Sequence, residues 1–337
     1  MNMNRILLRQ IAVTVMTVAV MFGTVACGGK KPSETMSDSE RLEVLDIKIK
    51  KKPKEADLLY ERAKVYVNLE RYNEAIADLE KATSLDDGKK EYFMLLGDTY
   101  FRIGRMDGSY SAIERVTQMD KNDREAWLKL GEIAFYSKDY DRAMDHLSQV
   151  TAADPNNRTA LELKGFIYKE TGDTANAASY FRKLTNLYPD YPRAYEELGN
   201  EYADRGNPLA LEYFATALRL DPSNTNVIYS LAMFYQNQGK MEKAEEHYKN
   251  LLDLDANNPY AWHNLGYIEM FHYGDYPQAI EYLKRAVECD PNYIEALANL
   301  ACAYALNGNR QEAAEYYDKA LAINPSFAPA LEGKKDL

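Results

Sequence analysis

Apolar residues recur along most of the chain at steps of three and four, with polar residues between them. This spacing gathers the apolar side chains on one face of an α-helix and predicts amphipathic helices. The helical segments, each about 14 residues long, come in pairs joined by a short turn that often contains glycine. Glycine suits the end of a helix, and proline suits the first turn of the next one or the link before it. The pattern therefore predicts an all-α chain.

The paired segments repeat with a period close to 34 residues. The prolines that close the pairs are separated by 34, 33, 69 and 34 residues, and the gap of 69 holds two periods: Pro155, Pro189, Pro222, Pro291 and Pro325. Self-similarity of this length predicts a repeat architecture, and one elongated solenoid rather than several compact domains. The repeats are expected to begin near Ala56, Lys90, Arg124, Arg158, Pro192, Thr225, Pro259 and Ile294.

Two repeats depart from the common length. Repeat five lacks one residue in the turn between Arg205 and Pro208, and repeat seven has one extra residue before Gly274. The extra residue either lengthens or distorts a helix, as in a π-bulge, or gives a variant of the turn. The turn variant is the simpler prediction, because loops tolerate insertions.

The repeated residues resemble those of the tetratricopeptide repeat (TPR) family. A Leu-Gly pair stands in the first helix as Leu96-Gly97, Leu130-Gly131, Leu198-Gly199 and Leu265-Gly266. A small residue opens the second helix as Ala75, Ala143, Ala177, Ala210, Ala244, Ala279 and Ala313. A bulky aromatic residue stands in its family position as Trp127, Tyr195 and Trp262. Repeat two departs most, with Ser109 in place of alanine and Lys121 in place of proline.

This resemblance implies a right-handed superhelical α-solenoid of about eight helix pairs over residues 56–327. It also implies that the first helix of each repeat lines a concave groove for a segment of a partner protein. The expected aromatic and polar lining is Phe101, Phe135, Tyr136, Phe166, Tyr229, Met233, Tyr260, His263, Asn264, Tyr267, Met270 and Asn299. The expected acidic lining is Glu162, Glu170, Glu196, Glu197 and Asp204, offset mainly by Lys169 and Arg193. The alternatives are that the aromatic residues belong to the core and that the acids are an ordinary solvated surface.

The N-terminal residues 1–26 have the layout of a signal peptide: Arg5 and Arg9, then an uncharged apolar run, then small residues. Cys27 follows directly, which resembles a bacterial lipobox and implies a lipid-anchored protein of the cell envelope. Thr24 departs from the leucine usual there, so cleavage without lipidation and an uncleaved anchor remain alternatives. A periplasm-facing outer-membrane lipoprotein is the expected location.

Three further segments complete the expected organisation. Residues 27–38 are polar and lack periodicity, so a lipidated Cys27 followed by a flexible tether is predicted. Residues 39–55 are expected to form a helix that covers the front of the solenoid as a half-repeat, and residues 328–337 a thin C-terminal cap.

Charge and reactive residues narrow the function. The net charge is -11, so an acidic surface repels phosphate backbones and nucleic acid is not an expected partner. No histidine stands in a metal-binding motif, and no phosphate-binding loop or nucleophile motif is present. We expect no enzyme activity, metal or cofactor. Cys289 and Cys302 are expected as free thiols, with a disulfide between them as the alternative.

The leading hypothesis is a lipid-anchored adaptor whose groove binds a protein segment, preferably a basic one. The second is a structural subunit of an outer-membrane secretion, pilus or cell-wall assembly, or a self-associating scaffold. A third is glycan binding by the tyrosine-rich face. The clamp with which chaperone-adaptor TPR domains hold a carboxylate is not matched, because Tyr60, Leu128 and Glu196 stand where its lysines would lie.

Overall fold

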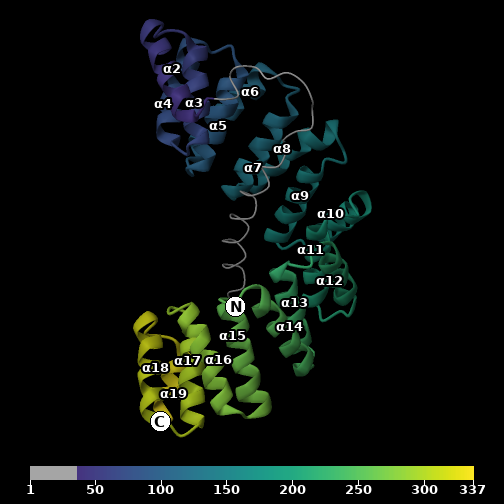
Figure 1. Ribbon diagram of the computed structural model, residues 1–337. Helices are drawn as coiled ribbons and strands as arrows, with labels where there is room; N and C mark the ends of the chain where they lie inside the picture. Colours follow the sequence, from purple (N-terminus) through teal and green to yellow (C-terminus); the bar gives the residue numbers. More distant parts are fainter. Residues whose placement is uncertain (1–35) are drawn as a thin grey trace. The chain divides into compact units, whose positions relative to one another are not determined.

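The computed structural model describes residues 36–337, and the regular structure over that range is entirely helical (Figure 1). The prediction of an all-α chain of paired helices is therefore confirmed for these residues. The predicted signal peptide, the lipidated Cys27 and most of the tether lie outside the described residues. None of the helices within 36–337 is both long enough and apolar enough to cross a membrane.

The helices form two compact units, of which the first ends at Ile103 and the second runs from Gly104 to Leu337. The division falls within repeat two, the repeat that departs most from the common pattern. The first unit contains α2 (Asp38–Lys51), α3 (Ala56–Asn68), α4 (Tyr72–Leu85) and α5 (Lys90–Arg102).

The second unit holds the remaining repeats. Its helices are α6 (Met106–Met119), α7 (Arg124–Tyr136), α8 (Tyr140–Ala153), α9 (Arg158–Glu170), α10 (Thr174–Leu187), α11 (Pro192–Asp204), α12 (Leu209–Leu220), α13 (Thr225–Asn237), α14 (Met241–Leu254), α15 (Pro259–Ile268), η2 (Glu269–Tyr273), α16 (Tyr276–Cys289), α17 (Ile294–Leu306), α18 (Arg310–Ile323) and α19 (Ala328–Lys335). The first helices of all eight pairs begin at the residues where the sequence places the repeat starts. Within this unit each helix packs on the next, and α7 also contacts α9, α11 contacts α13, and α17 contacts α19.

Close helix approach within a pair depends on the glycine of the Leu-Gly motif. A Cβ atom added at Gly199 would lie 2.5 Å from the Phe214 ring of the partner helix, and one at Gly131 would lie 2.7 Å from a Leu147 methyl carbon. Both separations are far below van der Waals contact, so the large side chain of the second helix fills the space that glycine leaves open. Phe214 and Leu147 are fully buried as a result.

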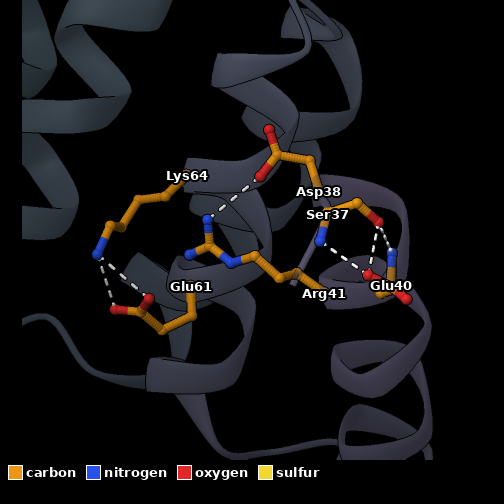
Figure 2. Close-up of polar contacts among 6 residues, drawn as sticks. All are labelled: Ser37, Asp38, Glu40, Arg41, Glu61 and Lys64. Carbon is orange, nitrogen blue, oxygen red and sulfur yellow. Dashed lines mark hydrogen bonds and ion pairs between the residues drawn. The ribbon is translucent and has the colours of Figure 1, made fainter. Parts of the chain in front are cut away.

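Helix α2 begins with a capping box, and an ion pair joins it to the next helix of the first unit. Ser37 accepts a hydrogen bond at Oγ from the Glu40 N–H (3.3 Å), while Glu40 accepts one from the Ser37 N–H (2.8 Å), as Figure 2 shows. Such a capping box stabilises a helix start by about 1 kcal/mol. Arg62 of α3 then bonds Asp46 of α2 at 2.6 Å and Asp78 of α4 at 2.7 Å. The predicted front helix therefore packs against the first repeat.

The C-terminal residues form a helix as well. Ala330 of α19 is fully buried, in a cluster with Leu297 of α17 and Tyr317 of α18. Leu331 is 38% exposed on the same helix. Among residues 328–337 the one buried side chain is therefore that of Ala330, which packs against the last repeat.

The two irregular repeats are accommodated differently. Repeat five shortens its second helix, since α12 has 12 residues whereas α10 has 14. Repeat seven keeps its extra residue in the first helix, as the five-residue π-helix η2, which Gly274 ends with a φ of 71°. The simpler prediction of a turn variant was therefore wrong. The helix takes up the insertion because its wider turn keeps the flanking apolar residues Ile268 and Met270 buried.

Candidate functional site

Two groups of residues in the second unit contain predicted groove residues. We name the first the charged cluster, which consists of Glu162 and Lys169 on α9 and Arg193, Glu196 and Glu197 on α11. We name the second the amide hollow, a depression of about 250 Å³ over α13, α15, α17 and the start of α19. Its lining residues are Gln236, His263, Asn264, Tyr267, Glu295, Ala298, Asn299, Phe327 and Pro329. Phe101 belongs to the first unit, where it is half-buried on α5.

Ion pairs in the charged cluster join α9 to α11. Lys169 Nζ lies 2.5 Å from Glu197 Oε2, and the Glu197 side chain is 5% exposed. Arg193 Nε lies 3.2 Å from Glu162 Oε1. Tyr191, which precedes α11, donates its hydroxyl to the same oxygen at 2.6 Å. The two helices are thus linked through side chains that are largely withdrawn from water.

Glu196 differs from its neighbour because no lysine or arginine pairs with it. The Asn224 amide donates to Glu196 Oε2 at 3.1 Å, while no cation lies within ion-pairing distance among the described residues. Burial, and then the negative charge of Glu197, raise the pKa of Glu196 to about 7. Its carboxyl group is therefore poised between the neutral and the charged form near neutral pH.

The charge balance of the cluster is negative. Three carboxylates, Glu162, Glu196 and Glu197, face two cations, Lys169 and Arg193. Burial raises the pKa of Glu162 even though Arg193 opposes that shift. Burial favours the neutral form of Lys169, but the charge and hydrogen bond of Glu197 together with the charges of Glu196 and Asp204 outweigh it, so the pKa of Lys169 is raised. A further positive charge would be stabilised here.

The imidazole of His263 stands at the centre of the amide hollow. Asn299 Nδ2 lies 2.8 Å from His263 Nε2, and the Tyr293 hydroxyl lies 3.3 Å from His263 Nδ1. Burial lowers the pKa of His263 to about 4. Both ring nitrogens of the neutral ring are then satisfied, with Asn299 donating to Nε2 and Nδ1–H donating to Tyr293.

Three side-chain amides reach the hollow from successive first helices. Asn264 is 7% exposed and donates to the Tyr229 hydroxyl at 3.2 Å. Gln236 accepts from the Tyr248 hydroxyl at 2.8 Å. Among the described residues, no hydrogen bond is made to the Oδ1 atoms of Asn264 and Asn299. These oxygens are acceptors that the hollow offers to a bound group.

Three predicted lining residues are buried in the core. Phe166 is 5% exposed and packs edge-on against Phe181 of α10, with ring centroids 5.3 Å apart. Phe135 is 9% exposed, and Met270 of η2 is 3% exposed. All three stand near the ends of first helices, on the flank that faces the second helix of the pair. None of the three lines the amide hollow, so we leave them out of the proposed binding surface.

The other predicted aromatic residues are placed closer to the surface. Tyr136, Met233 and Tyr229 are half-buried, and Tyr267 is 39% exposed. Tyr260 stacks edge-on with Tyr293 at 5.3 Å between centroids.

Sequence reasoning missed the two tyrosines that precede first helices. Tyr191 precedes α11 and bonds Glu162, and Tyr293 precedes α17 and bonds His263. Both reach back to the fifth residue of an earlier first helix, 29 and 30 residues upstream. Aligning the repeats on their first residue would have revealed this shared column.

Other features of the described residues say less about function. A hollow of about 460 Å³ lies at the turn between α7 and α8, and its lining includes the first residues of α8 and Thr171 after α9. Cys289 and Cys302 are free thiols, and residues 36–337 contain no group of His, Cys, Asp and Glu side chains arranged to hold a metal ion.

Family models match most of the repeat region. Tetratricopeptide repeat models match residues 56–88, 223–292 and 257–326. A model described as the cytochrome c-type biogenesis protein H TPR domain matches residues 86–195. Together the matched residues make up more than half of the chain.

Individual relatives match shorter stretches. The chain is 33% identical over 115 residues to photosystem I assembly protein Ycf3 from Rippkaea orientalis, which covers 28% of this chain and 62% of that protein. It is 28% identical over 138 residues to type IV pilus assembly protein PilF from Pseudomonas aeruginosa, which covers 39% of this chain and 54% of PilF. The chain spans less than two thirds of the length of the curated relatives it matches, and less than a quarter of several larger ones.

The fold has a counterpart among solved structures. The crystal structure of PilW, described as a widely conserved type IV pilus biogenesis factor, superposes with a TM-score of 0.55 at 21% identity. The match covers 62% of this chain and 97% of PilW. This similarity supports the α-solenoid fold.

Proposed function

Because the chain belongs to the tetratricopeptide repeat family, we propose that it is a protein-binding adaptor rather than an enzyme. Its first-helix surface binds a segment of a partner protein, and the charged cluster selects a segment with basic residues. Repeats of this family typically act as non-catalytic interaction scaffolds. The proposal assigns the contact to α9, α11 and α13.

The observation that carries the proposal is the charge left over at Glu196. This half-buried carboxyl group has the Asn224 amide as its hydrogen-bond partner and no ion-pair partner among the described residues, and its pKa is raised to about 7. A lysine or arginine of the partner would supply the missing countercharge and stabilise the ionised form. Partner binding and loss of the Glu196 proton are then coupled.

We further propose that the adaptor is held in a bacterial envelope by a lipid on Cys27. The small residues before Cys27 and the polar stretch after it support this, and PilF, a type IV pilus assembly protein, is a relative. A role in pilus assembly or in another envelope machine is the alternative that this relative favours. Metabolic labelling with a fatty acid analogue, compared between the wild-type chain and Cys27→Ala, tests the anchor. Equal labelling of the two proteins would refute it.

A charge reversal tests the binding surface. Labelled lysine- and arginine-bearing peptides and matched acidic peptides are titrated with the full chain, and fluorescence anisotropy reports binding. Glu196→Lys should weaken the binding of basic peptides at least tenfold. Glu212→Lys, the same change at an exposed site on α12, should leave them unaffected. Acidic peptides that bind as well as basic ones, or equal effects of the two substitutions, would sink the proposal.

A further inference from the structure

We propose that the amide hollow is a guanidinium pocket, which binds one arginine side chain of the partner segment. This inference rests on the proposed function, because it assumes that the partner lies along the first helices. It adds a second, chemically distinct contact beyond the charged cluster. The reasons lie in the size of the hollow, its acceptors, its rings and its charge.

The size of the hollow suits one side chain. At about 250 Å³ it lies below the range of roughly 300–1,000 Å³ typical of small-molecule sites. Its lining comes from three first helices and from the start of α19, where Phe327 and Pro329 form one wall. A side chain that projects from a segment lying along the first helices would enter it.

The polar groups of the hollow match a guanidinium. That group has five N–H donors in one plane and no acceptor. The Oδ1 atoms of Asn264 and Asn299 accept no hydrogen bond from the described residues, although Asn264 is 7% exposed. No side-chain oxygen of the described residues is both fully buried and without a hydrogen-bond partner, so these two acceptors remain open to a donor-rich ligand.

One carboxylate in the lining provides the countercharge. Glu295 is exposed at the start of α17 and makes no ion pair with the residues that the structure describes. None of the lining residues is a lysine or an arginine. His263 has both ring nitrogens hydrogen-bonded and a pKa lowered to about 4 by burial, so it stays neutral and does not repel a cation.

Two aromatic rings and one amide donor complete the pocket. Tyr267, which is 39% exposed, and Phe327 both line the hollow. Guanidinium groups pack on aromatic faces, where the ring quadrupole attracts the cation. The Gln236 Nε2 atom, a donor, is placed to meet a backbone carbonyl of the segment that carries the arginine.

The test compares three blocked amino acids: N-acetyl-arginine N-methylamide and its citrulline and lysine counterparts. Each is titrated into the full chain, and the side-chain amide NMR signals of Asn264 and Asn299 report binding. Citrulline has the shape of arginine without its charge, and lysine has the charge without the planar fork. Arginine should bind at least tenfold more tightly than either. Equal binding of arginine and citrulline, or no perturbation by arginine, would overturn the inference.

Variants make the assignment specific. Glu295→Gln should weaken arginine at least fivefold and leave citrulline unchanged, because it removes a charge and keeps the size. Glu281→Gln, at an exposed position on α16, is the matched control and should change neither. An arginine affinity unaltered by Glu295→Gln would also contradict the inference.

The result can be separated from the fate of the proposed function. If blocked arginine does not bind but Glu196→Lys still weakens the binding of basic peptides, only the guanidinium pocket is ruled out. If basic peptides never bind, the proposed function falls with it.

Discussion

The charged cluster and the amide hollow lie on the same series of first helices, yet they treat polar side chains in opposite ways. In the charged cluster, the buried carboxylate of Glu197 is paired at 2.5 Å with the half-buried Lys169. In the hollow, the buried groups are a neutral imidazole and amides, with His263 held between Tyr293 and Asn299. One repeat scaffold therefore supports two kinds of polar environment.

The difference follows from which residue type occupies one position of the repeat. The fifth residue of the first helix is Glu162 in repeat four and His263 in repeat seven, and the tyrosine directly before the next first helix bonds each of them. Beside Glu162 the next repeat supplies Arg193, a cation, whereas beside His263 the next repeat supplies Asn299, an amide. Neighbouring repeats thus set the charge state of a shared position.

The largest expected effect tests whether the two regions are independent. Gly199→Leu places side-chain atoms where Phe214 already lies, since a Cβ alone would come within 2.5 Å of its ring. We expect a loss of more than about 4 kcal/mol in unfolding free energy, measured by urea denaturation, because the helices cannot separate without exposing their core. Ala215→Leu, at an exposed position on α12, is the control and should change stability little.

Hydrogen exchange then sharpens the comparison. In a solenoid each repeat contacts mainly its neighbours, so protection should fall first in α11 and α12 and last in α15 and α17. Equal loss of protection in all four helices would mean that the charged cluster and the hollow unfold as one unit.

An intermediate effect comes from the buried ion pair. Lys169→Met leaves Glu197 buried without its cation, and we expect a cost of about 3 kcal/mol. Removing both partners, as Lys169→Met with Glu197→Met, should recover most of that loss. Asn299→Leu in the hollow should cost only about 1 kcal/mol, because it removes a neutral hydrogen bond. Thermal and urea melts of the four proteins give the comparison, which fails if the lysine and asparagine variants lose equal stability.

This expectation also corrects a view drawn from sequence alone. Glu196 and Glu197 are adjacent on a polar stretch and look equivalent, so reversing both charges would be expected to spare the fold. The structure buries Glu197 against Lys169 and leaves Glu196 beside Asn224. Only Glu196 is therefore suited to a substitution that tests binding.

The smallest effect is a pair of opposite pH dependences. For Glu196, whose pKa rises from 4.5 to about 7 on folding, the unfolded chain loses its proton first. Its contribution is therefore most favourable below pH 4.5 and falls as the pH rises towards 7. For His263, whose pKa falls from 6.5 to about 4, the unfolded chain gains a proton first, so stability falls as the pH drops from 6.5 towards 4.

Two variants isolate these slopes. As the pH rises from 4.5 to 7, the unfolding free energy of Glu196→Gln should increase relative to that of wild type by on the order of 2 kcal/mol. As the pH falls from 6.5 to 4, the unfolding free energy of His263→Phe should increase relative to that of wild type by a similar amount, on the order of 2 kcal/mol. The lost hydrogen bonds of His263 lower it by a constant amount at every pH. Urea denaturation across this range provides the measurement. Slopes of the same sign in both variants would contradict the burial that distinguishes the two sites.

The amino-acid sequence by itself determined the α-helical repeats and the residues at which their first helices begin. It did so because the 3.6-residue period is a local signal, and the Leu-Gly pair and the opening alanine recur often enough along the chain to fix the repeat. Close packing at Gly199 and Gly131 was likewise readable, since only glycine leaves room for the large residue opposite.

Tertiary structure decided which side chains of that pattern are available to a partner. Only the tertiary structure shows that Glu197 is buried while Glu196 is not, and that Phe166 lies in the core. It also shows that the extra residue of repeat seven forms the π-helix η2. It also joined Tyr191 to Glu162 across 29 residues. These outcomes depend on how closely successive repeats approach one another, and that distance is set by the side chains of both neighbours rather than by the period of either one.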